Sequence, residues 1–244
     1  LRELCAEPFM VNPRFWLVIP AAGIGQRMQA ECPKQYLKLH HRFILDITLS
    51  RVLGSGLFDG CMVALNPRDH WWPDSASADD ERVQTCTGGA ERADSVLAAL
   101  EALAGHAADG DWVLVHDAAR PCLHPHDLSN LIDTLAEHPV GGLLAAPVAD
   151  TLKLAGGGLP PEVDSTVDRK QLWRAFTPQM FRFGALRRAL EDCLQQGQAV
   201  TDESSAMEFA GYSPVLVEGR SDNIKITVPA DLALAEFLLG QQGG

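Results

Sequence analysis

The chain lacks the signatures of several common protein classes. No Gly-Lys pair occurs among its 244 residues, which excludes a P-loop, because that loop ends in Gly-Lys-Ser/Thr. The six cysteines form no C-x-x-C pair and no His/Cys cluster at zinc-ligand spacing, so a zinc site of that kind is not expected. We predict reduced thiols and a cytoplasmic location.

Positive charge and long apolar runs are also scarce. Lys and Arg number 20 against 32 Asp and Glu, and the net charge of -12 disfavours binding to nucleic acid or anionic membrane. No apolar run approaches the roughly 20 residues of a membrane span, and residues 1–15 lack the apolar core of a signal peptide. We expect no nucleic-acid or membrane partner, and a loosely ordered extension over residues 1–15.

The remaining length suits one large α/β domain over residues 16–239. Short apolar runs between glycines and prolines alternate with amphipathic segments, a pattern typical of a mostly parallel sheet in a three-layer α/β sandwich. The predicted strands cover 16–19, 61–65, 83–86, 112–115, 142–148 and 215–217. The predicted helices cover 44–53, 96–104, 126–137, 183–194, 201–210 and 229–239.

The first strand runs into a glycine-containing loop, Ile19-Pro20-Ala21-Ala22-Gly23-Ile24-Gly25-Gln26-Arg27-Met28. A dinucleotide fingerprint would need Gly or Ala where this loop has Met28. Small residues after a buried strand let the backbone approach a ligand closely, and the freed N–H groups can cradle an anion. With Arg27 and Lys34 nearby, the loop predicts a polyphosphate site.

A second glycine segment, Gly88-Gly89-Ala90-Glu91-Arg92-Ala93-Asp94-Ser95, precedes the helix predicted from residue 96. Ser95 has two readings. It is a favourable N-cap residue, and it also stands where a helix N-terminus can bind a phosphate or another polar ligand. The glycine pair favours the ligand contact.

Polar residues follow the strand at 112–115 in the segment His116-Asp117-Ala118-Ala119-Arg120-Pro121. Ligands of parallel sheets bind beyond the carboxyl ends of the strands, which marks Asp117 and Arg120 as candidate site residues. Facing a triphosphate, Asp117 suits a Mg²⁺ ligand, although a turn or capping role is the alternative. His116 is expected to be a packed, hydrogen-bonded residue.

Residues 150–169 break the α/β pattern. They contain three consecutive glycines and paired prolines between two extended segments, which predicts a two-stranded arm that protrudes from the domain. Such a ribbon is marginal alone, so packing against a second copy of the chain is the simplest way to hold it. We therefore expect a homodimer through the 150–169 arm.

Seven segments in a fixed order make the chain resemble a known enzyme family. They resemble those of the 2-C-methyl-D-erythritol 4-phosphate cytidylyltransferases, the cytidylyltransferase family of the non-mevalonate isoprenoid pathway. The segments span most of residues 16–239 and are 20–28, 33–36, Gly88-Gly89-x-x-Arg92, 115–121, Thr177-Pro-Gln179, Thr201-Asp-Glu203 and Asp222-Asn-Ile-Lys225.

The resemblance implies a fold of the nucleotide-diphospho-sugar transferase type, with a Rossmann-like sheet, in a Mg²⁺-dependent homodimer. The implied enzyme transfers CMP from CTP to 2-C-methyl-D-erythritol 4-phosphate by attack of the substrate phosphate on the α-phosphorus. The products would be 4-diphosphocytidyl-2-C-methyl-D-erythritol and pyrophosphate. Phosphate nucleophiles are ionised at neutral pH, which fits a site of Arg, Lys and Asp without a strong base.

The resemblance also implies roles for individual residues. Four are implied in catalysis: Arg27, Lys34, Arg169 and Lys225. Seven are implied in CTP binding: Ala21, Ala22, Gly23, Gly25, Gly89, Ser95 and Asp117. The acceptor is expected to contact Arg120, Thr151, Thr177 and Thr201, with some of these supplied by the arm of the other subunit. Asp117 and Asp222 are the implied Mg²⁺ ligands.

Three alternatives stay open at this point. The nearest in chemistry is a ribitol-5-phosphate cytidylyltransferase or another sugar-phosphate nucleotidyltransferase, which would differ mainly around Thr151 and Arg169. A nicotinamide-dependent dehydrogenase on a similar sheet is disfavoured by Met28 in the first loop. A binding domain without activity is disfavoured by the combination of cations and a carboxylate.

Overall fold

The structure of the chain is a computed structural model that describes residues 13–23, 28 and 32–242. A seven-stranded sheet forms its centre, in the order β11-β7-β10-β6-β1-β4-β5. Only β10 runs antiparallel to its neighbours β6 and β7, which confirms the mostly parallel sheet. The strands are β1 (Phe15–Ala21), β4 (Gly60–Leu65), β5 (Val83–Thr87), β6 (Trp112–Val115), β7 (Gly141–Pro147), β10 (Trp173–Arg182) and β11 (Val215–Glu218).

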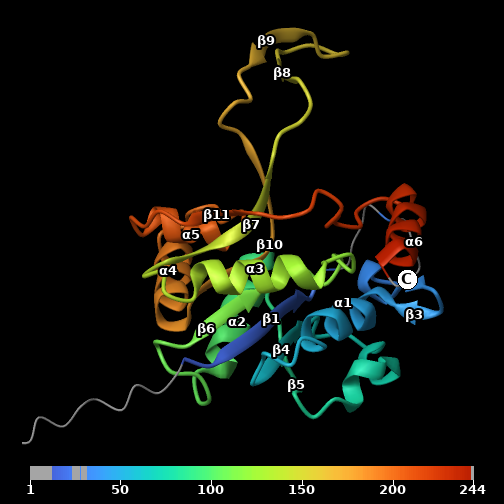
Figure 1. The fold of residues 1–244 in the computed structure, drawn as a ribbon, viewed down its shortest axis with the longest axis vertical. Helices are drawn as coiled ribbons and strands as arrows, with labels where there is room; N and C mark the ends of the chain where they lie inside the picture. The colour runs from blue at the N-terminus through green and yellow to red at the C-terminus, as the bar shows by residue number, and fades with distance from the viewer. Residues whose placement is uncertain (1–12, 24–27, 29–31, 243–244) are drawn as a thin grey trace, which may run out of the picture.

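Helices cover both faces of this sheet, as Figure 1 shows. One apolar cluster packs α1 (Ile44–Leu53) and α3 (Pro125–Leu135) on one face. Another packs α2 (Arg92–Leu103), α4 (Phe183–Gln195) and α5 (Glu203–Phe209) on the opposite face. The three-layer α/β sandwich is therefore confirmed. In a third apolar cluster, α6 (Ala230–Gln242) packs against α1 and the segment after β6.

The predicted arm is present and stands away from the body (Figure 1). Strands β8 (Leu152–Ala155) and β9 (Val163–Val167) pair antiparallel in a sheet of their own. Most of the arm's side chains are exposed, including Leu154 and Leu159. The ribbon has almost no apolar packing within its own chain.

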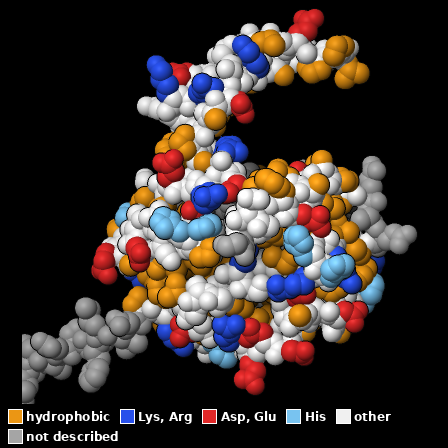
Figure 2. Space-filling model, turned by 45° about the vertical axis from the view of Figure 1, so that its right-hand side comes forward, with side chains coloured by type: hydrophobic (Ala, Val, Ile, Leu, Met, Phe, Trp, Pro, Cys, Tyr) orange, Lys and Arg blue, Asp and Glu red, His pale blue; other side chains and the backbone are white. Residues whose placement is uncertain are grey.

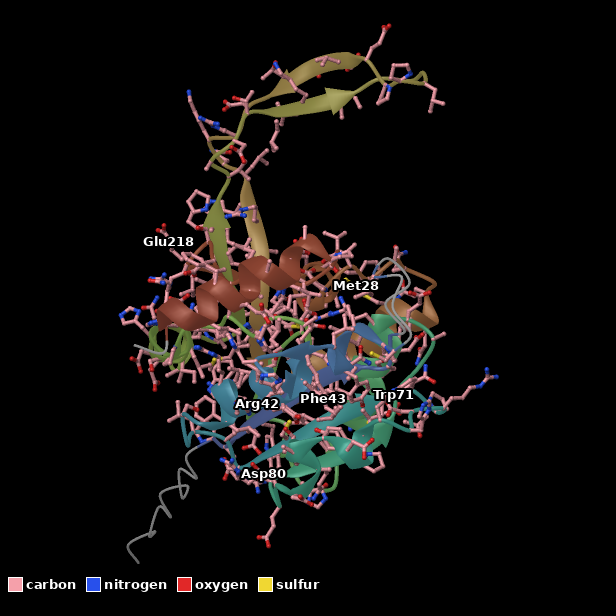
Figure 3. All side chains as sticks on the ribbon, turned by 90° about the vertical axis from the view of Figure 1, so that its right-hand side faces the viewer. Met28, Arg42, Phe43, Trp71, Asp80 and Glu218 are labelled. Carbon is pink, nitrogen blue, oxygen red and sulfur yellow. The ribbon has the colours of Figure 1, made fainter. Side chains whose placement is uncertain are left out.

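Short elements organise the region between β1 and β5. Strands β2 (Lys38–Leu39) and β3 (Arg42–Phe43) form a small hairpin, and turns of 3-10 helix cover Lys34–Tyr36, Trp72–Asp74 and Ala76–Asp79. The ring of Tyr36 stacks on Trp71 and meets the edge of Phe43, both labelled in Figure 3. Trp71 therefore packs locally, and it also lines a cavity described below.

Several predicted boundaries shift. Strand β1 begins at Phe15, inside the predicted extension, and α6 ends at Gln242. Helix α2 begins at Arg92 with Glu91 as N-cap, so the predicted start at residue 96 and the capping role of Ser95 are wrong. Helix α5 has Asp202 as its N-cap and begins at Glu203, two residues after the predicted start. No helix among the described residues is long and apolar enough to cross a membrane.

Candidate active site

A cavity of about 220 Å³, here called the loop cavity, opens at the carboxyl ends of β1 and β6. Ligands of parallel sheets bind at this edge. The cavity brings together most of the predicted CTP-binding residues with two predicted catalytic lysines. Its lining consists of Pro20, Ala21, Ala22, Gly23, Lys34, Gln35, Gly89, Ala90, Glu91, Arg92, Ser95, Asp117, Ala118, Ala119 and Lys225.

Close packing explains the pair Gly88-Gly89, of which Gly89 lines the loop cavity. A Cβ atom on Gly88 would lie 2.6 Å from the Cβ atom of Ala22, and one on Gly89 would lie 2.2 Å from the Cβ atom of Asp94. Ser95 is buried, accepts a hydrogen bond from the Gly89 N–H at 3.1 Å and donates one to the Glu91 carbonyl. Ser95 therefore holds the shape of the glycine segment from the first turns of α2.

The loop cavity borders a larger space of about 830 Å³, the outer cavity. Four residues line both of them: Ala22, Gly23, Gly89 and Ala90. The outer cavity continues past Pro33 to residues 66–71. Together the two spaces offer room for a ligand of nucleotide size.

A third space of about 300 Å³, the arginine cavity, lies on the other side of Asp117. It gathers three of the four predicted acceptor-binding residues, Arg120, Thr177 and Thr201. Its lining consists of Arg92, Asp117, Arg120, Ala175, Phe176, Thr177, Gln179, Thr201, Asp202 and Lys225. Arg92, Asp117 and Lys225 line both the loop cavity and the arginine cavity.

Asp117 forms the centre of a charged cluster between these cavities. Its Oδ1 accepts from Arg92 Nε at 3.0 Å, and its Oδ2 lies 3.2 Å from Arg120 Nε and 2.8 Å from Lys225 Nζ. Arg92 also forms a two-bond pair with Glu203, at 2.7 and 3.1 Å. The pairing keeps three cations close together where they would otherwise repel one another.

This cluster fixes the ionisation of its members. Burial alone would raise the pKa of Asp117, but the charges of Arg92, Lys225 and Arg120 outweigh burial and hold that pKa well below its usual range. Burial lowers the pKa of Arg120, and Asp117 opposes that shift. Asp117 is therefore a carboxylate at every physiological pH.

His116 and Thr177 form a buried hydrogen-bond chain beneath Asp117. His116 Nε2 lies 3.1 Å from the Arg120 carbonyl, which can only accept, so Nε2 donates and Nδ1 accepts from the Thr177 hydroxyl at 2.9 Å. The same hydroxyl accepts the Asp117 N–H at 3.1 Å. His116 is thus the packed histidine that we expected, and the Thr177 hydroxyl proton points inward rather than to a ligand.

Acid should destabilise the protein through His116. Burial lowers the pKa of His116 from 6.5 to about 4, so below pH 6.5 the unfolded chain binds a proton that the folded chain does not. Folding stability is therefore lost as pH falls from 6.5 toward 4. Between pH 7.5 and 5 this group should cost about 2 kcal/mol.

The measurement is urea unfolding of the protein and of His116→Gln at both pH values, without nucleotide or metal. The variant is expected to lose about 2 kcal/mol less than the parent protein over this interval. An equal pH dependence in the two proteins would contradict the assignment.

The predicted metal ligands do not fit a magnesium site built by the protein. Both carboxylate oxygens of Asp117 are already paired with cations, and the carboxylate of Asp222 pairs with Arg220 at 2.5 Å. Asp222 does not line the loop cavity. Within 13–23, 28 and 32–242, no group of three His, Cys, Asp or Glu side chains could hold a metal ion.

Within one chain, the arm residues lie apart from the loop cavity and the arginine cavity. Thr151 and Arg169 line a separate space of about 400 Å³, the arm cavity, together with Thr166, Val167 and Asp168. None of these five residues lines the loop or the arginine cavity. Arg169 donates to the Ala149 carbonyl at the base of the arm.

Two predicted site residues lie outside the part of the chain that the structure describes, and the sequence analysis gave no role to two residues of the charged cluster. Gly25 and Arg27 lie outside the described residues. Arg92 and Glu203 stood in recognised segments without a predicted role, although both belong to the charged cluster. A cation in the first turn of a helix opposes the helix dipole, which is a signal that could have singled out Arg92.

Comparison with known proteins decides the family. The family model described as 2-C-methyl-D-erythritol 4-phosphate cytidylyltransferase matches residues 15–241. The chain belongs to this family. The resemblance found in the seven sequence segments is therefore confirmed.

Relatives with this name match over nearly their whole length. The protein of Pseudomonas putida (strain GB-1) is 55% identical over 226 residues, covering 91% of this chain and 95% of the relative. The protein of Pseudomonas entomophila (strain L48) is 56% identical over 223 residues, covering 91% and 94%. The family match over residues 15–241 includes both the body and the arm.

Solved structures agree with the fold. A crystal structure of 4-diphosphocytidyl-2C-methyl-D-erythritol synthase has a TM-score of 0.80 at 37% identity, covering 93% of this chain and 98% of the other. The Francisella tularensis 2-C-methyl-D-erythritol 4-phosphate cytidylyltransferase has a TM-score of 0.80 at 36% identity, covering 92% and 99%. The fold of the family is thus the fold of this chain.

Proposed function

We propose that this chain transfers CMP from CTP to 2-C-methyl-D-erythritol 4-phosphate, releasing pyrophosphate. The relatives are named for this transfer, as 2-C-methyl-D-erythritol 4-phosphate cytidylyltransferases. The observation that carries the proposal is the wall shared by the loop cavity and the arginine cavity. Asp117, Arg92 and Lys225 form this wall. This arrangement suits two anionic substrates that meet at one point.

The chain's residues can perform the transfer by positioning and charge. CTP binds in the loop cavity, and the acceptor phosphate binds in the arginine cavity beside Arg120. The acceptor phosphate attacks the α-phosphorus of CTP, a new P–O bond forms, and pyrophosphate leaves. Lys34 and Lys225 stabilise the negative charge of the transition state, because both cations line the cavity in which that charge develops.

Label transfer tests this proposal. With CTP labelled in the α-phosphate, the label should appear in the diphosphocytidyl product, whereas label in the γ-phosphate should appear in pyrophosphate. Label from the γ-phosphate in the organic product would indicate phosphoryl transfer instead, and would refute the proposed reaction.

We propose that Mg²⁺ enters this site together with CTP. Mg²⁺ in nucleotide sites is bound largely by phosphate oxygens and water. Because both oxygens of Asp117 are already paired with cations, the triphosphate and water would supply most of the ligands of the ion. When bound, the ion would neutralise charge on the triphosphate. Because the described residues form no metal site of their own, we expect EDTA to abolish turnover without changing the melting temperature of the ligand-free protein.

A second copy of the chain is proposed to complete the acceptor site. Figure 2 shows the arm as a lobe joined to the body by a narrow stalk, with hydrophobic side chains at its free end. Leu152, Leu154, Leu159 and Val163 of the arm are exposed. A homodimer would cover these side chains and carry Thr151 and Arg169 to the partner's arginine cavity. The cytoplasm is the proposed compartment.

A further inference from the structure

Arg92 occupies the boundary between the two substrate spaces. It lines both the loop cavity and the arginine cavity, as only Asp117 and Lys225 do among the described residues. If CTP and the acceptor bind in these spaces, the attacked phosphorus lies at this boundary. A side chain in this wall can therefore contact the phosphates that react.

The guanidinium of Arg92 keeps donors for a ligand. It carries five N–H groups, of which one binds Asp117 and two bind Glu203. Two donors remain without another partner among residues 13–23, 28 and 32–242, and the side chain is 26% exposed. These two N–H groups belong to different terminal nitrogens and point to different sides of the guanidinium, so each can donate to one phosphate oxygen.

Glu203 fixes the orientation of the Arg92 guanidinium. Its side chain is fully buried at the first position of α5, and its two oxygens accept from the two terminal nitrogens of Arg92 at 2.7 and 3.1 Å. A buried ion pair contributes little net stability compared with apolar packing, because both charges lose water. The clearest consequence of the pair is a fixed guanidinium.

The charge of the cluster favours an anion. Three cations, Arg92, Arg120 and Lys225, face two carboxylates, Asp117 and Glu203, which leaves a net charge of +1 before any ligand binds. Outside this cluster, the two cavity linings add one cation, Lys34, and two carboxylates, Glu91 and Asp202. The positive charge available to a phosphate is therefore local to the cluster around Arg92.

We infer that Arg92 is a catalytic residue that contacts the reacting phosphates, and that the buried carboxylate of Glu203 positions it. This inference rests on the proposed function for the identity of the phosphates. It separates two roles along one chain of contacts: Arg92 meets the substrate, whereas Glu203 acts only through Arg92.

A double-mutant cycle tests both roles. Turnover is measured for Arg92→Ala, Glu203→Gln and the double variant, with Glu208→Gln as the control on the same helix, since Glu208 is exposed. We expect losses of about 100-fold, about 10-fold, about 100-fold and less than twofold, respectively. Added guanidinium at tens of millimolar should restore part of the activity of Arg92→Ala but not of a Lys34→Ala control.

Calorimetric binding of inorganic pyrophosphate gives a readout without an acceptor. Its affinity should fall about 10-fold in Arg92→Ala, about threefold in Glu203→Gln and no further in the double variant. If this series holds while the unaltered protein shows no cytidylyl transfer, the proposed function fails, whereas the phosphate contact of Arg92 and its dependence on Glu203 stand. Folding of each variant is verified by its melting temperature. If Arg92→Ala unfolds, Arg92→Lys replaces it, because lysine keeps the positive charge without the planar guanidinium.

Two results would overturn the inference. One is a double variant whose loss is the product of the single losses, because Glu203 would then act independently of Arg92. The other is a folded Arg92→Ala or Arg92→Lys protein with turnover and pyrophosphate affinity within threefold of the parent protein.

Discussion

Lys34→Ala is expected to lower turnover by about 100- to 1000-fold while the protein stays folded. Lys34 lines the loop cavity, and its Nζ lies 3.2 Å from the carbonyl of Ile226, next to Lys225. The ammonium is therefore held beside the triphosphate site, where charge develops as pyrophosphate leaves. Its loss removes transition-state stabilisation rather than core packing.

Lys38→Ala is the matched control for this prediction. Lys38 is an exposed cation four positions further on, with its Nζ over the ring of Phe43, and it does not line the loop cavity. Its removal should leave turnover within twofold. A folded Lys34→Ala protein with near-normal turnover would remove Lys34 from the mechanism.

A mixed dimer of Lys34→Ala and Arg169→Ala chains should have about half of the turnover of the unaltered dimer, although each variant alone is nearly inactive. The reason is that Arg169 lines the arm cavity, apart from the loop and arginine cavities of its own chain. If each arm serves the partner, the mixed dimer contains one site with both residues intact. The two chains can be coexpressed with different tags and purified as the mixed species.

Lys225→Ala supplies the control for this experiment. Lys34 and Lys225 line one cavity of the same chain, so a mixed dimer of Lys34→Ala and Lys225→Ala has no intact site and should stay inactive. Inactivity of the Lys34→Ala and Arg169→Ala mixture as well would mean that Arg169 serves its own chain or that no dimer forms. Either result would contradict the proposed role of the arm.

The layered fold could be predicted because its signals are local. Buried strands such as β1 and β6 are continuous apolar runs, and the arm is marked by consecutive glycines and prolines. Strand β10 was harder to predict as a strand, since Arg174, Thr177 and Pro178 interrupt its apolar pattern and its register shifts there. Helix starts were misplaced where a neighbouring acidic residue, Glu91 or Asp202, took the capping role.

The site could be predicted in part, where its signals are also local in the sequence. Residues at strand ends, such as Asp117, follow from the rule that ligands bind at the carboxyl edge of a parallel sheet. The ion pair between Arg92 and Glu203 joins positions 111 residues apart, and nothing in their local sequence specifies that contact. Only the tertiary fold, which places the first residue of α5 beside the first residue of α2, brings Glu203 to Arg92.

The most direct test of the proposed function is pyrophosphate release from CTP and Mg²⁺ with two acceptors in parallel reactions. One reaction contains 2-C-methyl-D-erythritol 4-phosphate, and the other contains ribitol 5-phosphate. We predict rapid release with the first acceptor and release near the rate without acceptor for the second. Release with ribitol 5-phosphate alone would contradict the proposed acceptor, and release with neither would contradict the proposed transfer.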